Sequence, residues 1–486
     1  MHVRIGIRRQ LKPREHLVFL AGSARAIPSG YFSRAEQSFI REQRKKKLEM
    51  IPFNRLTHWL IIQFIPETEE INQRLEQCRK AGDKLQAFLN EQKIARITLS
   101  DAEKHPAETE ALAEGIALGA YRFLKYKSGH DGESHLREIL IHSAAATSDI
   151  PRKLDPVLRG VCFARDLVNE PNSFLTAPAF ARAITGMAKE AGIKAEVLNR
   201  KKLEALKMGG LLGVNQGSEQ PPVFMVLEYA PDKTRNSHPV VLIGKGIVYD
   251  SGGMNLKTGD HMENMKNDMA GGAAVAGILL AVARAGLPVH VIGLIPATDN
   301  RPGPRAMVSG DILRMHNGMT IEVINTDAEG RLILADALSY AKRYKPALVI
   351  DLATLTGSAI RAIGKQAIAG MESRATTEFT RLKACGFSVW ERIVELPLWD
   401  DYAESLKSDL ADLKNVGGPE AGAITAGKFL QQFTDYPYIH LDIAGPAFAD
   451  KRDSYRGQGG TGAGVRLLVK FLEQRPPHEN TEAHQD

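Results

Sequence analysis

The segment VVLIGKGIVYDSGGMNLKTGDHMENMKNDMAGGAAV, which starts at Val240, contains the clearest indication of the fold of this chain. Its first five residues form a continuous apolar run typical of a buried strand, and the pattern from Ala270 to Ala285 predicts a helix. A strand followed by such a helix is typical of a crossover connection over a parallel sheet. Between the two, Asp250 and Asp268 stand among residues too apolar or too rich in glycine for an ordinary solvated surface.

Further apolar runs occur on both sides of this segment. Helical patterns separate them, notably that from Leu332 to Arg343, and the alternation predicts a mixed, largely parallel sheet flanked by helices. Sites in such sheets form at the carboxyl ends of strands. The expected strands are VFMVLEY (from Val223), VVLIG (Val240), VHVIGLIPA (Val289), TIEVIN (Thr320), ALVIDLATL (Ala347) and YIHLDIAG (Tyr438).

The length and composition of the chain favour a two-domain α/β protein. Its 486 residues suffice for two domains, and 43% hydrophobic with 25% charged residues is ordinary for a soluble globular protein. Residues 1–150 predict a small N-terminal α/β domain. Residues 151–473 predict a larger catalytic domain that contains the sheet described above, and the polar residues 474–486 predict a disordered tail.

The three cysteines indicate the cellular compartment. Cys78, Cys162 and Cys385 are far apart and odd in number, so they predict neither a disulfide framework nor a CxxC metal site. A reducing cytoplasm therefore fits best. No apolar run approaches the length of a membrane span, and we expect no membrane association.

The positive charge of the chain is concentrated near the N-terminus. Residues 1–60 contain thirteen lysines and arginines against four acidic residues, and the densest part is REQRKKKLE, Arg41 to Glu49. This segment raises the alternative that the protein binds nucleic acid. Because no aromatic residues are interleaved with these charges, a solvated helix or loop is the favoured interpretation.

A second acidic segment, NTDAEGRL from Asn325 to Leu332, places Asp327, Glu329 and Arg331 at every second position. In an extended chain such residues share one face, so the spacing favours a strand or strand end. Together with the segment from Val240, it could form an oxygen-rich pocket for divalent cations. Two cations in such a pocket would support hydrolysis, but spacing alone leaves phosphatase, nuclease and peptidase open.

Two other motifs fail on their context. GQGGTG at Gly457 satisfies the GxGxxG pattern, but SYR precedes it instead of a buried strand, so dinucleotide binding is not expected. GAITAGKF at Gly422 resembles a phosphate-binding loop, but Phe429 stands where that motif requires serine or threonine.

The segments GKGIVYDSGG, MKNDMAGGAA and NTDAEGRL closely resemble the three signature segments of the cytosolic leucyl aminopeptidase family, the dimetal peptidases also called M17. Flanking matches include RDLVNEPN at Arg165, DLATLTGS at Asp351 and HLDIAG at His440. The resemblance extends from Ala111 to Leu472, and it is poor before Ala111. It implies a metallo-aminopeptidase that removes the first residue of peptides with free N-termini.

The resemblance also implies a role for each residue of these segments. The metal ligands would be Lys245, Asp250, Asp268, Asp327 and Glu329, with Asp250 and Glu329 bridging both ions. A metal-bridging hydroxide would attack the scissile carbonyl. Lys257 would stabilise the developing oxyanion, and Arg331 would hold a bicarbonate ion that acts as general base.

The first-residue pocket, the cofactors and the assembly are implied in the same way. The cofactors would be bicarbonate and two divalent ions, Zn or Mn, with Mg or Co as alternatives; the assembly would be a homohexamer. Ala447 falls where some relatives carry methionine, so a wider pocket and a less strict leucine preference are expected. The positions that match the pocket are Met265, Asn325, Thr354, Leu355, Gly357, Ala444 and Ala447.

Overall fold

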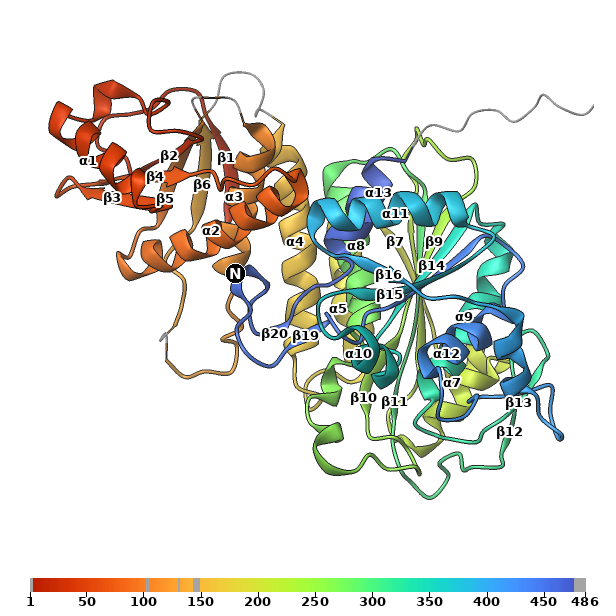
Figure 1. Cartoon of the computed structure of the whole chain (residues 1–486). Coiled ribbons are helices and arrows are strands. Elements are labelled where there is room, and N and C mark those ends of the chain that lie inside the picture. The colour runs from red at the N-terminus through yellow and green to blue at the C-terminus, as the bar shows by residue number, and fades with distance from the viewer. Residues whose placement is uncertain (1–2, 102, 104, 130–131, 143–148, 476–486) are drawn as a thin grey trace, which may run out of the picture. The chain divides into compact units, whose positions relative to one another are not determined.

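The computed structural model describes residues 3–101, 103, 105–129, 132–142 and 149–475, which form two compact α/β units (Figure 1). The division falls inside helix α4 (Ile150–Asn169), whereas the boundary expected from the sequence is the start of that helix. The predicted tail lies outside the described residues except for Gln474 and Arg475. The first unit contains residues 1–162 and 451–458, and the second contains residues 163–450 and 459–486.

The first unit is built on a six-stranded sheet with the order β1-β6-β5-β2-β4-β3. All neighbours are parallel except β3 and β4, which are antiparallel. Helices α2 and α3 pack closely against each other, since a Cβ atom on Gly115 would lie 2.0 Å from the carbonyl oxygen of Arg79. The elements are β1 (Arg4–Arg8), β2 (Leu17–Ala21), α1 (Arg34–Lys45), β3 (Met50–Asn54), β4 (Trp59–Phe64), α2 (Ile71–Glu91), β5 (Arg96–Asp101), α3 (Pro106–Gly119) and β6 (Glu138–His142).

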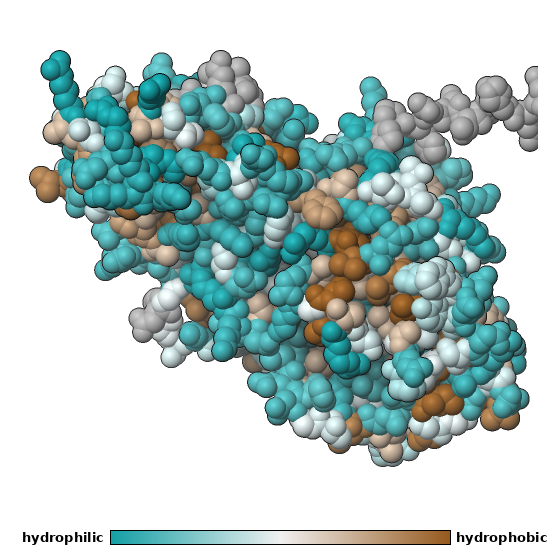
Figure 2. Space-filling view, viewed as in Figure 1, coloured by the Kyte–Doolittle hydropathy of each residue, from teal (hydrophilic) through white to brown (hydrophobic). Residues whose placement is uncertain are grey.

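The basic segment Arg41 to Glu49 forms the end of α1 and the residues that follow it. Ser33 caps this helix in a capping box with Glu36, and Ile40 is its buried residue. Figure 2 shows mostly hydrophilic residues gathered over α1. The segment therefore contains an exposed helix, one of the two conformations expected from its sequence.

The second unit is built on a nine-stranded mixed sheet with the order β16-β15-β18-β14-β9-β11-β8-β7, and β10 pairs with β11. Its centre, from β18 to β11, is parallel, and β8, β7 and β15 run antiparallel to their inner neighbours. All the predicted strands are present, although Thr320–Glu322 belongs to a small separate sheet, β12-β13-β17. The strands are β7 (Lys194–Leu198), β8 (Val223–Tyr229), β9 (Val240–Gly244), β10 (Gly246–Asp250), β11 (Val291–Asn300), β12 (Ile312–Arg314), β13 (Thr320–Glu322), β14 (Leu348–Ala353), β15 (Ile368–Ser373), β16 (Ile393–Glu395), β17 (Leu413–Lys414), β18 (Tyr438–Asp442), β19 (Phe448–Ala449) and β20 (Gly459–Gly460).

Helices cover both faces of this sheet (Figure 1). On one face, α8 packs on β9, β11 and β14 and contacts α5 and α13, while α11 packs on α13. On the other face, α9 packs on β9 and β11 and contacts α7 and α12. The fold class predicted from the sequence is confirmed. The helices are α5 (Ala177–Ala191), α6 (Arg200–Ala205), α7 (Gly209–Val214), α8 (Ala270–Ala285), α9 (Glu329–Ala341), α10 (Gly357–Ile363), α11 (Thr376–Val389), α12 (Gly422–Gln431) and α13 (Val465–Glu473).

Helix α8 lies in the core of the second unit. The stretch Gly259–Ala285, which ends with this helix, is long and apolar enough by composition to cross a membrane, but 83% of its apolar window is buried inside the protein. Every residue of α8 from Ala270 to Val282 is buried. Its apolar character is explained by its position as a core helix between the sheet and the helices that pack on it.

Candidate metal centre

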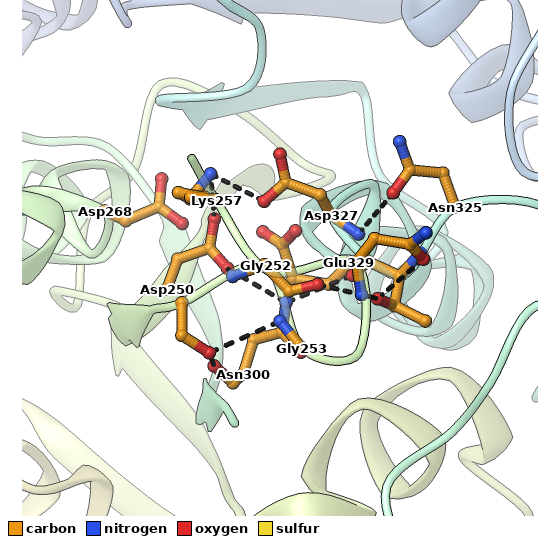
Figure 3. Close-up of polar contacts among 12 residues, drawn as sticks. Asp250, Gly252, Gly253, Lys257, Asp268, Asn300, Asn325, Asp327 and Glu329 are labelled. Carbon is orange, nitrogen blue, oxygen red and sulfur yellow. Dashed lines mark hydrogen bonds and ion pairs between the residues drawn. The ribbon is translucent and has the colours of Figure 1, made fainter. Parts of the chain in front are cut away.

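The five predicted metal ligands lie together at the ends of central elements of the second unit, and Figure 3 shows four of them, Asp250, Asp268, Asp327 and Glu329. Two come from strands: Lys245 separates β9 from β10, and Asp250 is the last residue of β10. The other three precede or begin helices. Asp268 directly follows a 3-10 turn (Met265–Asn267) before α8, Asp327 precedes α9, and Glu329 is the first residue of α9.

The main chain around Lys245 is held on two sides. Its N–H donates to the carbonyl oxygen of Leu352 in β14, and its own carbonyl oxygen accepts from the N–H of Gly272 in α8. The side chain passes close to α9, where a Cβ atom on Gly330 would lie 2.5 Å from its Cε atom. Glycine at position 330 therefore leaves the space through which the lysine reaches the carboxylates.

The extended conformation expected for NTDAEGRL is wrong. The side chain of Asn325 accepts a 2.8 Å hydrogen bond from the N–H of Asp327, which forms a turn, and Glu329 and Arg331 then lie in the first turn of α9. An acidic first residue is favourable because it faces the positive end of the helix dipole. Side chains of a first turn can all reach a site beyond the helix N-terminus, and both residues line the same cavity as Asp327.

Two lysines, Lys245 buried and Lys257 partly buried, each lie between two carboxylates. The Nζ atom of Lys245 is 2.7 Å from Asp268 Oδ2 and 3.0 Å from Glu329 Oε1. The Nζ atom of Lys257 is 2.8 Å from Asp250 Oδ2 and 2.6 Å from Asp327 Oδ1. When all six groups are ionised, the four carboxylates outnumber the two ammonium groups, and the largely buried cluster carries a net negative charge.

Burial and this excess charge together shift the pKa values of the cluster. Burial, reinforced by the charge of Asp250, raises the pKa of Glu329 to about 8. Burial also raises the pKa of Asp268 to about 6. Burial alone would lower the pKa of Lys245, but Asp268 and Glu329 outweigh it and raise that pKa above its ordinary value. The protein groups by themselves therefore keep Lys245 protonated.

The donor set fits divalent cations. Asp250, Asp327 and Glu329 each offer an oxygen within 4.8 Å of the others. Oε2 of Glu329 is buried and has no hydrogen-bond partner within the described part of the chain. Clustered carboxylate oxygens are hard ligands suited to such ions, and bound cations would neutralise the excess charge.

Arg331 presents its guanidinium to the same cavity. Its Nη1 atom donates a 2.7 Å hydrogen bond to the carbonyl oxygen of Asn415, and its Nε atom is buried with no hydrogen-bond partner among the described residues. Burial lowers its pKa to about 10, so the group is still positively charged at neutral pH. The side chain therefore keeps donors that a small anion could use.

One cavity of about 710 Å³ connects the charged cluster with the predicted first-residue pocket. Ala447 is 2% exposed and contributes to its wall. The cavity also contains an arginine and a lysine that sequence reasoning missed, Arg361 and Lys365. All seven predicted pocket positions line it: Met265, Asn325, Thr354, Leu355, Gly357, Ala444 and Ala447.

Sequence reasoning also missed a layer of polar residues behind the ligands. Asn300 ends β11, lies beside Asp250 (Figure 3) and donates a hydrogen bond to it. Thr326 and Asn255 hydrogen-bond to each other. The one available signal was the group of polar residues, Thr298 to Asn300, that follows the apolar run from Val289. Together, the sheet and its carboxylate cluster define an α/β protein with a site whose clustered oxygen donors fit divalent cations, as in metal-dependent hydrolases.

Comparison with known proteins identifies the family. The catalytic-domain model of the cytosol aminopeptidase family matches residues 162–469, and its N-terminal-domain model matches residues 69–130. The chain therefore belongs to the cytosol aminopeptidase family, M17, and is a hydrolase of the aminopeptidase type. It is 42% identical over 459 residues to a probable cytosol aminopeptidase of Geotalea uraniireducens, with 92% of each chain covered. A protein of the same name from Geobacter sulfurreducens is 46% identical over 374 residues, which cover 76% of this chain and 75% of that protein.

Solved structures agree with this assignment. A mutant of tomato leucine aminopeptidase is similar with a TM-score of 0.85 and 26% identity, and the match covers 97% of both chains. The bottromycin maturation enzyme BotP in complex with Mn is similar with a TM-score of 0.82 and 32% identity, over 94% of this chain and 98% of that one.

Proposed function

We propose that the protein is a dimetal aminopeptidase that removes the N-terminal residue from peptides. The observation that carries the proposal is the buried set of carboxylates and lysines that shares one cavity with the predicted first-residue pocket. The residues that would hold two divalent ions, Zn or Mn with Mg or Co as alternatives, are Lys245, Asp250, Asp268, Asp327 and Glu329.

Bound cations would supply a bridging hydroxide as nucleophile and would polarise the scissile carbonyl. For Lys245 to act as a ligand, its ammonium must lose a proton, against the effect of Asp268 and Glu329 on its pKa. A neighbouring dication reverses that effect because it repels the positive charge. The unpartnered oxygen of Glu329 supports its role as a bridging ligand.

Two residues would act on the reaction without serving as ligands. Lys257 keeps its positive charge because Asp250, Glu329 and Asp327 outweigh the effect of burial on its pKa, so it can stabilise the oxyanion that develops on the substrate. Arg331 holds a bicarbonate ion through the donors that it presents to the cavity. That anion would supply the general base that takes the proton from the water from which the hydroxide forms.

Substrate selection would follow from the cavity. A free α-amine would bind at the cation site, which restricts cleavage to the first residue. The side chain of that residue would enter the pocket beside Ala447. The small alanine side chain in the cavity wall would leave room for side chains larger than leucine. We also propose, from the family, a homohexamer in the cytoplasm.

The test is an assay of metal-stripped protein on a panel of aminoacyl amides, before and after addition of Mn or Zn. Activity should be absent without metal and return with it. Peptides with acetylated N-termini should be very poor substrates compared with the free forms. Full activity after exhaustive chelation, with metal content checked by elemental analysis, would contradict the dimetal mechanism, and equal turnover of acetylated peptides would indicate an endopeptidase.

A further inference from the structure

Asn300 lies at the point where two ligand-bearing segments meet. It is the last residue of β11, a strand whose ten residues are all buried, and its side chain is 1% exposed. Asn300 is also the register partner of Asp250 in the pairing of β10 with β11. It does not belong to the described residues that line the cavity. The residue is thus mounted on a rigid element directly behind a predicted ligand.

The side-chain amide of Asn300 binds both segments at once. Its Nδ2 atom donates a 2.9 Å hydrogen bond to Asp250 Oδ1 and a 3.0 Å hydrogen bond to the carbonyl oxygen of Thr326 (Figure 3). Thr326 directly precedes Asp327. The two hydrogens of one amide group therefore connect the loop that carries Asp250 to the turn that carries Asp327.

The main chain of Asn300 is held as firmly as its side chain. Its carbonyl oxygen accepts hydrogen bonds from the N–H of Ser251 at 3.1 Å and from Ser251 Oγ at 2.7 Å. Gly253 packs against the amide, because a Cβ atom there would lie 2.7 Å from Asn300 Oδ1, and its φ of +66° is also one that glycine adopts readily. The amide has little freedom to turn away from Asp250.

These contacts orient the carboxylate of Asp250. Its Oδ1 atom accepts from Asn300 and, at 2.9 Å, from the N–H of Gly252. Its Oδ2 atom lies 2.8 Å from the Lys257 ammonium, on the side of the carboxylate cluster. With Oδ1 held by two neutral donors, Oδ2 is the oxygen presented to a cation.

A second connection between the same two segments lies beside the first. The N–H of Asn255 donates to Thr326 Oγ1 at 2.8 Å, and the N–H of Thr326 donates to Asn255 Oδ1 at 2.8 Å. The hydroxyl of Thr326 also lies 2.6 Å from the carbonyl oxygen of Gly252. In each of the two segments, a main-chain N–H thus donates to a side chain of the other segment, and these bonds join the loop after β10 to the turn before α9.

We propose that Asn300 is a positioning residue of the metal centre: it holds Asp250 and Asp327 at the separation that the cations require and aims Oδ2 of Asp250 at them. Thr326 completes this connection. The inference rests on the proposed dimetal function. Residues that orient metal ligands by hydrogen bonds typically change metal affinity about 10- to 100-fold when they are replaced.

The experiment is calorimetric titration of the metal-free full-length protein with Mn²⁺ alone, which measures affinity and stoichiometry without reference to turnover. Asn300→Ala should weaken Mn²⁺ binding about 10- to 100-fold. Asn215→Ala is the matched control. Asn215 is a fully buried asparagine of the same unit, and its amide donates to Gln220 O and Thr298 Oγ1, neither of which is a predicted ligand or a hydrogen-bond partner of one. That variant should lose thermal stability but bind Mn²⁺ as the wild type does.

A second pair of variants keeps the proposal testable if Asn300→Ala does not fold. Thr326→Val keeps the shape of the side chain but removes the hydroxyl, and Thr326→Ser restores it. The valine variant should bind Mn²⁺ more weakly, and the serine variant should recover most of the affinity. A merely structural role would lower the melting temperature of both asparagine variants without this selective effect on binding.

The outcomes separate the two proposals. If wild-type protein binds Mn²⁺ but folded Asn300→Ala and Thr326→Val bind it equally well, the positioning role is wrong and the dimetal function stands. Equal losses of Mn²⁺ affinity in Asn300→Ala and Asn215→Ala would also overturn the positioning role. Failure of the wild type to bind Mn²⁺ at all would overturn the proposed function, and the inference with it.

Discussion

The Nζ atom of Lys257 lies 2.6 Å from Oδ1 of Asp327, within contact distance of a predicted metal ligand without being one itself. Its side chain is 14% exposed and lines the cavity, so the ammonium can reach a substrate oxygen. This distinguishes it from Lys245, whose side chain is 3% exposed and is enclosed by Asp268 and Glu329. Replacement of Lys257 should therefore affect turnover, whereas replacement of Lys245 should affect metal occupancy.

Lys257→Ala should retain two metal ions but lose about 10²- to 10³-fold in kcat, the usual effect of removing one oxyanion donor. Metal content and turnover are measured on the same preparation. Lys245→Ala serves as the contrast, since it removes a ligand and should lower metal occupancy. Loss of metal from Lys257→Ala would instead place this lysine in the structural support of the ligands.

Arg331→Ala should leave both metals bound and reduce turnover by about 10²-fold or more, the scale of lost general-base assistance. The remaining rate should respond less to added bicarbonate. Arg331→Lys keeps a charge but loses the planar pair of donors, so it should recover only part of the rate. Full activity of Arg331→Ala with an unchanged bicarbonate response would require another role for this residue.

Glu329→Gln should lower both metal occupancy and rate. The substitution removes a negative charge from the centre, and it replaces one of the two carboxylate oxygens, of which Oε2 has no hydrogen-bond partner among the described residues, by an NH2 group. Elemental analysis after gel filtration measures the occupancy. The metal occupancy and rate of this variant are compared with those of Arg331→Ala, two residues further along α9. The comparison tests whether one of these residues is needed for metal binding and the other only for catalysis. Full occupancy in the glutamine variant would argue against a bridging ligand at this position.

Metal affinity should rise with pH between about 6 and 8. Burial raises the pKa values of Asp268 and Glu329 to about 6 and about 8, so both carboxyls tend to be protonated below these values, and a cation must displace their protons. Higher pH removes this competition, and affinity increases until both groups are ionised. Titration of metal-free protein in buffers of different ionisation enthalpy measures the protons released, and an affinity independent of pH over this range would contradict the assignment.

Ala447→Met should narrow the first-residue pocket. Ala447 is buried in the cavity wall, and a longer side chain there must extend into the space that a substrate would use. The ratio of kcat/KM for phenylalanyl over alanyl amides should fall by about 10-fold, the scale expected when a well-packed pocket loses a few methylene volumes. An unchanged ratio would mean that the first residue binds elsewhere in the cavity.

The chemistry of the centre was accessible from the sequence because it depends on residue types within short segments. The acids and lysines of the stretch from Val240, and the three charges of NTDAEGRL, suffice to predict hard oxygen ligands and a hydrolytic site. The strand VVLIG and the helix Ala270–Ala285 were predicted with the bounds that the structure has. Both are continuous apolar elements of the core, where the local pattern and the tertiary packing favour the same conformation.

Only the tertiary structure decided the conformation of NTDAEGRL and the identity of the residues behind the ligands. Alternating charges are compatible with a strand, but the turn at Asn325 and the packing of α9 on the sheet place Glu329 and Arg331 in a helix. Asn300 is fifty positions from Asp250 in the chain. Their hydrogen bond exists because β10 and β11 pair in one register, and a long-range pairing of this kind leaves no local pattern in a single sequence.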